Sequence, residues 1–270
     1  MRDRDCVAFL QWALPHMGMR WAGYRKVRHQ VCKRINRRMQ QLSLASPAAY
    51  RTFLENDPGE WRYLAGLCSV TISRFFRDKA VFRTLASSVL PDLSRRAASC
   101  GDGTLSVWSA GCGSGEEPYT VALLWHFILA PELPDSQILI LGTDVQLHLL
   151  QRASRARYPE SALRDLPNEW RTAFDWQGRE FHLRPEYRTP VRFAVHDART
   201  GAPGGPFDVV LCRNLAFTYW DKSLQSEGLR RIGVGLKAGG VLVVGRHEVL
   251  PSDAEYLTPW PGSSCIYRMQ

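Results

Sequence analysis

Short apolar runs alternate with helical patterns through the second half of the chain. Four runs have the length and the continuous hydrophobicity of buried parallel strands: 105–109, 138–141, 207–212 and 241–244. The segments between them show helical periodicity, near 117–130, 146–156 and 221–236. This alternation predicts an α/β fold with a Rossmann-like, doubly wound domain over 105–270.

A different pattern interrupts this domain. The apolar stretches 181–183 and 191–195 lie on either side of the sequence Arg-Pro-Glu-Tyr at 184–187. Two short strands around a proline-containing turn are typical of an antiparallel pair. We therefore expect a small β-hairpin insertion at about 176–195, beside the main sheet.

The first ninety residues carry helical signals only. Ser46-Pro47 and Asp57-Pro58 each place a capping residue before a proline, which is the usual start of a helix. A basic helix is predicted at about 24–44. These signals predict a helical N-terminal domain over 1–90.

The stretch 91–104 follows this helical part. Its residues are mostly small or polar, and it includes two glycines. We therefore predict a linker there, between the helical domain and the α/β domain.

Positive charge is concentrated near the N-terminus. The chain has a net charge of +9 and a pI near 9.4, and neither Asp nor Glu occurs between Asp5 and Glu55. The predicted basic helix contributes five candidate docking residues: Arg28, Lys33, Arg34, Arg37 and Arg38. An acidic protein surface and a nucleic acid are both suitable partners, and a merely solvated helix face is the alternative.

Other classes of protein find little support in the composition. The seven cysteines lack Cys-x-x-Cys spacing, which favours reduced thiols, and the seven histidines show no metal-ligand spacing, so no metal site is expected. The charged start is unlike a signal peptide, and no apolar stretch reaches the roughly 18 residues of a membrane span. These features predict a cytoplasmic protein without membrane insertion.

A glycine-rich turn follows the first predicted strand. Gly111, Gly113 and Gly115 precede Glu116 and Glu117, which begin a helical pattern. Such turns usually hold phosphate, but two carboxylates at the helix start would repel it. A cationic ligand without phosphate suits the turn better, and S-adenosylmethionine has an ammonium and a sulfonium group. The alternative is a tight turn whose acids only stabilise the helix dipole.

Polar residues also follow the later strands. An acid at the end of the second strand, Asp144, is placed to accept hydrogen bonds from ribose hydroxyls, and Asp197 could accept one from an adenine amino group. Arg213 and Asn214 follow the strand at 207–212. Each residue alone could be a helix cap, but together they predict adenosine binding.

The same motifs carry a family resemblance. The segments 70–78 (Val-Thr-Ile-Ser-Arg-Phe-Phe-Arg-Asp), 115–119 (Gly-Glu-Glu-Pro-Tyr), 143–144, 212–214 (Cys-Arg-Asn) and 236–240 resemble the CheR-type chemotaxis receptor protein-glutamate O-methyltransferases. The resemblance implies an all-helical N-terminal domain before a class I methyltransferase domain with a small antiparallel insertion. It also implies S-adenosylmethionine as methyl donor and S-adenosylhomocysteine as product.

The resemblance further implies a set of site residues. Those expected to contact the cofactor or line its pocket are Thr71, Ser73, Arg77, Glu117, Asp144, Asp197, Ala198, Arg213 and Asn214. Arg77 is also our candidate for orienting the substrate carboxylate. The family tyrosine near the transferred methyl group falls on Thr218 here, so Tyr219, one position later, is the second catalytic candidate.

The sequence departs from the family pattern in two further segments, and the second concerns the expected partner. The segment Arg246-His247 replaces the usual His-Ser of the last motif, and 175–179 lacks the glycine-expanded loop of members that tether to a receptor C-terminal peptide. Recognition of such a tether is therefore not expected. The basic helix would instead dock on an acidic helical region of the receptor.

Three functions are consistent with these observations. The first is formation of methyl esters on glutamates of a chemoreceptor or a similar signalling protein. The second is the same chemistry on another acceptor, a peptide or a small metabolite, and the third is a non-catalytic docking module that responds to S-adenosylmethionine. Methylation of nucleic acid is disfavoured, because the strand at 207–212 lacks the Asn/Asp-Pro-Pro-aromatic signature of amino-methylating enzymes.

Overall fold

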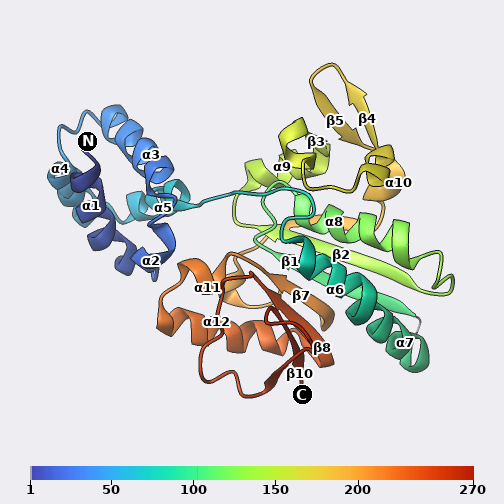
Figure 1. Ribbon diagram of the computed structural model, residues 1–270. Coiled ribbons are helices and arrows are strands. Elements are labelled where there is room, and N and C mark those ends of the chain that lie inside the picture. The colour runs from blue at the N-terminus through green and yellow to red at the C-terminus, as the bar shows by residue number, and fades with distance from the viewer. Residues whose placement is uncertain (1, 102) are drawn as a thin grey trace. The chain divides into compact units, whose positions relative to one another are not determined.

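The computed structural model describes residues 2–101 and 103–270, which form two compact units (Figure 1). The first extends to Ile72 and includes Thr218–Gln225, and the second comprises Ser73–Phe217 and Ser226–Gln270. The division thus falls near residue 72, whereas the sequence placed a boundary near 90. Among the described residues, no helix combines the length and the apolar character that a membrane span requires.

The first unit is all-helical, as predicted. Its helices are α1 (Asp3–His16), α2 (Trp21–Tyr24), α3 (Arg28–Gln41), α4 (Pro47–Asn56) and α5 (Pro58–Cys68). The predicted basic helix at 24–44 corresponds to α3, which begins at Arg28 and ends at Gln41. Val31, Ile35 and Met39 recur every four residues and bury one face of α3 against the core of this unit. Ser46 and Asp57 cap α4 and α5, as expected from the sequence.

A disulfide joins α1 to α3. Cys6 and Cys32 are bonded, with their Cα atoms 5.9 Å apart. The prediction of reduced thiols was therefore wrong for this pair, because the packing of two helices brings together cysteines that are 26 positions apart in sequence. Cys68, Cys112, Cys212 and Cys265 are free and buried.

The second unit contains a seven-stranded sheet in the order β6-β2-β1-β7-β8-β10-β9. Its strands are β1 (Thr104–Ala110), β2 (Gln137–Asp144), β6 (Val191–Val195), β7 (Phe207–Cys212), β8 (Leu236–Val244), β9 (Leu257–Pro259) and β10 (Ile266–Met269). The first five strands in that order are parallel neighbours, whereas β10 runs antiparallel to β8 and β9. All six residues of β7 are buried, which explains its uninterrupted apolar sequence. The Rossmann-like class I methyltransferase fold is confirmed.

Helical segments accompany this sheet. They are α6 (Lys79–Thr84), η1 (Leu85–Val89), α7 (Leu90–Cys100), α8 (Glu116–Leu124), η2 (Trp125–Leu129), α9 (Leu147–Arg155), α11 (Ala216–Tyr219) and α12 (Lys222–Val234). Helix α7 occupies most of the stretch 91–104 that was predicted as a linker. Leu90 and Leu93 are buried there, so the polar residues of this segment form the outer face of a helix.

The predicted insertion is present with different strand partners. A three-stranded antiparallel sheet has β5 (Glu180–Leu183) between β3 (Arg157–Tyr158) and β4 (Phe174–Gln177), and Figure 1 shows the β4–β5 hairpin projecting. The stretch 191–195 is β6, which pairs in parallel with β2, so its predicted pairing with 181–183 was wrong. The pattern of apolar residues predicts that a segment is a strand, but it does not predict which strand pairs with it. Short helical segments connect these parts: η3 (Glu160–Leu163), η4 (Asn168–Ala173), α10 (Pro185–Arg188) and η5 (Ala198–Thr200).

Candidate active site

The carboxyl ends of three neighbouring strands bring the predicted cofactor residues together. Ala110 at the end of β1 is in register with Thr143 of β2, and Asp144 is in register with Val195 of β6. The glycine turn, Asp144 and Asp197 therefore share one edge of the sheet. Ligands of open parallel sheets bind at this edge.

The glycine turn has the backbone that its sequence predicts. Gly111, Gly113 and Gly115 have φ values of 68°, 58° and 89°, which favour glycine over other residues. A Cβ atom at Gly111 would lie 2.8 Å from the side chain of Leu215. The turn is bound to the next strand, because the Gly113 N–H donates to Asp144 Oδ2 at 3.0 Å.

Asp144 is buried and lies beside exposed apolar side chains. Its Oδ1 accepts from the Gln146 N–H at 2.9 Å. Burial raises the pKa of Asp144, while the hydrogen bonds from Gln146 and Gly113 act against this rise. Three apolar side chains at the same edge are more than half exposed, those of Val145, Leu147 and Val195. A flat ring such as adenine could cover them.

Asp197 has an internal partner. Its carboxylate accepts from the Arg199 side chain, with Arg199 Nε 2.9 Å from Oδ2, and from the Arg199 N–H at 3.0 Å. Burial alone would raise the pKa of Asp197, but these hydrogen bonds hold it below its usual range. Ala198, the neighbouring candidate, is buried at the start of η5. Contact of either residue with adenine stays a prediction.

A buried arginine links two other predicted site residues, Arg77 and Glu117, and also contacts Asp78. The Arg213 side chain is 2% exposed, and its Nη1 donates to Glu117 Oε2 at 2.7 Å. Its Nη2 donates to Asp78 Oδ2 at 2.7 Å and to the Arg77 carbonyl at 2.9 Å. Ser109 Oγ donates to the other Glu117 oxygen at 2.7 Å. Arg213 thus connects the start of α8 with the loop that contains Arg77.

The loop around Arg77 is held by buried aromatic rings. Phe75 packs edge-on against Tyr158 at 4.8 Å, and Phe76 lies edge-on to Trp170 at 5.1 Å between ring centroids. Phe76 and Asp78 have φ values of 57° and 63°, a backbone that is unfavourable for residues with a side chain. Arg77 Nη2 lies 3.4 Å from Asn214 Oδ1. These aromatic contacts anchor the loop in the core of the second unit.

Two glutamates that were not among the expected site residues complete the site, although the sequence had drawn attention to Glu116 as part of the glycine-rich turn. Glu116 is 5% exposed and hydrogen-bonds to the side chain of Ser73, and burial raises its pKa. Glu248 Oε2 accepts from the N–H groups of Asn214 at 2.8 Å and Gly245 at 2.6 Å. The available signals were the first carboxylate of the Glu-Glu pair and an acid three residues after Gly245 at the end of β8.

The remaining candidates belong to the first unit. Thr71 precedes the division of the chain, and the Tyr219 ring lies 5.1 Å from that of Tyr24. Tyr219 is partly buried against the helical core of this unit, and its carbonyl accepts from the Arg20 N–H at 2.8 Å. Its catalytic role stays a prediction.

The five candidate docking residues are in different environments. Arg38 donates twice to the buried Glu60, at 2.9 and 2.7 Å, and Arg34 donates to backbone carbonyls of Leu67 and Ser69. Arg28 hydrogen-bonds to Asp3. Lys33 and Arg37 are exposed. Arg34 and Arg38 therefore stabilise the helical unit, whereas Lys33 and Arg37 present charge on its surface.

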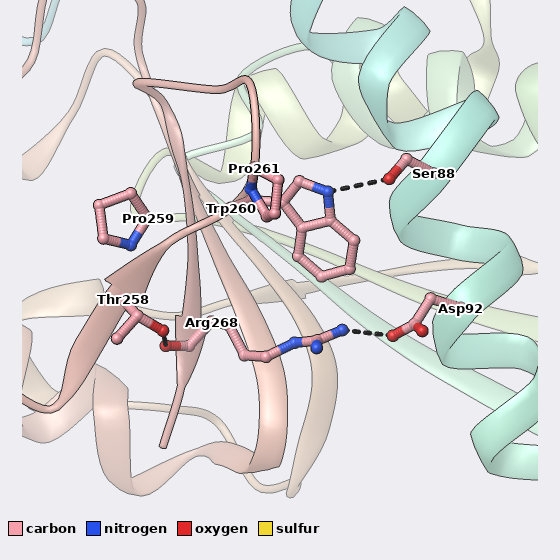
Figure 2. Close-up of a pocket in the computed structure, with 7 residues that line it drawn as sticks. All are labelled: Ser88, Asp92, Thr258, Pro259, Trp260, Pro261 and Arg268. Atoms are coloured by element: carbon pink, nitrogen blue, oxygen red, sulfur yellow. Dashed lines mark hydrogen bonds and ion pairs between the residues drawn. The ribbon is translucent and has the colours of Figure 1, made fainter.

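A pocket elsewhere in the second unit has no predicted site residue in its lining. Seven residues line it: Ser88, Asp92, Thr258, Pro259, Trp260, Pro261 and Arg268. Figure 2 shows Trp260 and Arg268 reaching from the C-terminal strands toward Ser88 and Asp92. The Trp260 indole donates to Ser88 Oγ at 2.9 Å, and Arg268 forms an ion pair with Asp92. These pairs attach β9 and β10 to the helical segment 85–100.

The fold and the site together define a class I methyltransferase. Family comparison is more specific: "CheR methyltransferase, SAM binding domain" matches residues 71–265, and "CheR methyltransferase, all-alpha domain" matches residues 9–66. The chain therefore belongs to the CheR methyltransferase family, and the resemblance noted in the sequence is confirmed. S-adenosylmethionine is the cofactor of this methyltransferase.

Relatives differ in length. A chemotaxis protein methyltransferase of Listeria monocytogenes is 30% identical over 261 residues, covering 94% of this chain and 93% of the relative. One from Escherichia coli is 30% identical, covering 82% and 76%. An uncharacterized 104.1 kDa protein of Rhodobacter capsulatus is 33% identical over 82% of this chain, which spans only 23% of that protein.

The residues at the sheet edge fit this cofactor. Asp144 offers carboxylate oxygens for ribose hydroxyls, exposed apolar side chains lie beside it, and the glycine turn lets the backbone approach a ligand closely. Glu117 lies at the start of α8 directly after the turn, held there by Ser109 and Arg213.

We expect Asp144→Ala to weaken the binding of S-adenosylmethionine about 30-fold, because a hydrogen bond to a charged group contributes about 2 kcal/mol. Calorimetric titration would measure the dissociation constant. The matched control is Asp135→Ala, since Asp135 is an exposed acid in the loop before β2. Equal affinity in the two variants would remove Asp144 from the cofactor site.

Proposed function

We propose that this protein transfers the methyl group of S-adenosylmethionine to glutamate side chains of a chemoreceptor or a similar signalling protein in the cytoplasm. The observation that carries the proposal is the loop at 73–79, where Arg77 lies next to Asn214 in a family of methyltransferases. The names of the Listeria and Escherichia relatives, both chemotaxis protein methyltransferases, support the same class of substrate.

The chemistry requires alignment more than proton transfer. A glutamate side chain has an ordinary pKa of about 4.3, so near neutral pH it is already a carboxylate and needs no general base. An oxygen of this carboxylate forms a bond to the methyl carbon while the bond from that carbon to sulfur breaks, which leaves a neutral thioether and a methyl ester. Arg77 holds the carboxylate through paired guanidinium donors, and this orientation lowers the barrier.

The internal hydrogen bonds of the site support this role for Arg77. Arg213 pairs with both Asp78 and Glu117, and it stays protonated because a guanidinium does not lose its proton in proteins. The Arg77 carbonyl is fixed by Arg213 and the flanking aromatic rings are buried, so the loop backbone is preorganised. A preorganised cation costs little reorganisation when the substrate carboxylate arrives.

The helical unit would contribute substrate binding. Lys33 and Arg37 are exposed on α3, four positions apart and therefore on one face of the helix. Such a face suits an acidic helical region of a receptor. Tyr219 is proposed to take the place of the family tyrosine near the methyl group.

The deciding experiment uses the full chain and S-adenosylmethionine labelled in the methyl group. The acceptor is the cytoplasmic fragment of a chemoreceptor, and label released by base as volatile methanol marks a carboxyl methyl ester. We expect base-labile label on the fragment, and its loss when the receptor glutamates are replaced by alanine.

Other outcomes would favour the other candidate functions. Binding of the cofactor without label on the fragment, but with label on another peptide or metabolite of a cell extract, would indicate a different acceptor. Binding without label on any acceptor would indicate a non-catalytic docking module. Either result would overturn methylation of a receptor.

A further inference from the structure

Three cationic side chains surround a single carboxylate beside the loop that carries Arg77. Asp165 Oδ2 lies 3.1 Å from Arg74 Nε and 3.8 Å from Arg164 Nε, and its Oδ1 lies 3.9 Å from Lys79 Nζ. We call Arg74, Lys79, Arg164 and Asp165 the Asp165 cluster. One carboxylate leaves two positive charges uncompensated within it.

Neighbouring acids are engaged elsewhere. Asp78, which lies between Arg77 and Lys79 in sequence, accepts from the buried Arg213 at 2.7 Å. Glu160, in the η3 turn, is 3.9 Å from Arg171. The excess of positive charge in the cluster is therefore not cancelled by these two carboxylates.

The cluster is exposed and rigidly supported. The side chains of Lys79 and Arg164 are 46% and 62% exposed, so an external carboxylate can reach them. The Phe75 N–H donates to the Ala162 carbonyl at 3.0 Å, which binds the loop to the η3 turn next to Arg164. Buried Phe75 and Phe76 fix the backbone between Arg74 and Arg77.

The cluster also lies close to the proposed acceptor site. Arg74 and Lys79 are three and two positions from Arg77, so consecutive Cα spacing keeps each within about 11 Å of it along the chain. Side chains one turn apart on a helical acceptor are about 5.4 Å apart along its axis, which falls within this limit. A glutamate held by Arg77 would place its acidic neighbours near the cluster.

We propose that the Asp165 cluster is a second carboxylate-binding site, which selects acceptor segments that carry another acidic side chain close to the glutamate being methylated. This inference rests on the proposed function, since it concerns the same acceptor. It adds a sequence requirement: an acidic residue within about one helical turn of the reacting glutamate. Methylation of that neighbour removes its charge, so a prior methyl ester nearby would slow the next transfer.

The test is a double-mutant cycle on the rate of methyl transfer. The enzyme variants are Arg164→Gln and Lys79→Gln, and the control is Arg95→Gln, an exposed arginine on α7. The acceptor is the chemoreceptor fragment, either unchanged or with the acids within four positions of each labelled glutamate replaced by glutamine. The readouts are kcat/KM at low and high salt and the dissociation constant of S-adenosylmethionine.

We expect Arg164→Gln or Lys79→Gln to lower kcat/KM about fivefold through KM, with unchanged cofactor affinity, because surface charge pairs have effects of this size. The neutralised acceptor should show a similar loss with the unchanged enzyme and no further loss with the variants. High salt should diminish the difference.

Two results would overturn the second site while leaving the proposed function intact. In one, the losses of kcat/KM from the enzyme variant and from the neutralised acceptor add up; in the other, the variants have the same kcat/KM as Arg95→Gln. No label on any form of the fragment with the unchanged enzyme would overturn the proposed function, and this inference with it.

Discussion

Arg77→Ala is expected to lower kcat about 1000-fold while the dissociation constant of S-adenosylmethionine changes by less than about threefold. Removal of a preorganised group that acts on the reacting atoms typically costs a factor of 100 to 1000, and Arg77 has the additional role of aligning the carboxylate. The backbone carbonyl of this residue, which accepts from Arg213, is retained in the variant. Single-turnover labelling of the receptor fragment and calorimetric titration would separate the two effects.

Two variants serve as controls for this prediction. Arg83→Ala removes an exposed arginine from α6 and should leave kcat unchanged. Arg77→Lys keeps the charge but loses the paired donors, so it should recover only part of the turnover. Near-normal turnover in Arg77→Ala would remove this residue from the proposed catalytic role, and an equal loss of cofactor affinity would reassign it to cofactor binding.

Arg213→Ala is expected to lower the free energy of unfolding by about 3–5 kcal/mol, because it leaves two poorly exposed carboxylates without their partner. Asp78 and Glu117 each lie 2.7 Å from the guanidinium, and the arginine side chain is 2% exposed. Differential scanning calorimetry would show the loss as a lower melting temperature. Arg95→Ala, a surface change, should shift stability by less than about 0.5 kcal/mol.

A triple variant shows whether the loss of stability in Arg213→Ala comes from unpaired buried charges or from lost packing. Arg213→Met combined with Asp78→Asn and Glu117→Gln removes the charges together with their partner. We expect this triple variant to recover most of the lost stability, since replacing a whole buried ion pair is often nearly neutral. Stability as low as that of Arg213→Ala would show that packing of the guanidinium on Phe82, 4.9 Å from its ring centroid, dominates instead.

The sequence predicted those elements whose local signal agrees with their tertiary role. The buried runs at 207–212 and 241–244 are central strands, and Ser46-Pro47 and Asp57-Pro58 begin helices, as predicted. It failed where a local pattern has two tertiary solutions. The stretch 191–195 could pair within a hairpin or join the main sheet, and only the position of β2 decided between them.

The candidate site likewise contains residues that the sequence identified and contacts that it could not predict. The positive φ angles of the glycine turn and the position of the acid at the end of β2 follow from residue type and spacing, so the sequence identified these residues. The partners of Glu60, Arg213 and Glu248 did not follow from spacing. Glu60 is three positions after the cap residue Asp57, a spacing typical of a local capping role, yet its carboxylate accepts from Arg38 and Tyr50.

By itself, the sequence determined the class of fold, the cofactor and the family, because these depend on periodicity and on short motifs whose residues act locally. Tertiary structure alone decided that Cys6 meets Cys32, that Arg213 joins Asp78 to Glu117, and that three cations meet at Asp165. The physical reason is that ion pairs and disulfides depend on distances between segments far apart in sequence, and packing of the apolar core sets those distances.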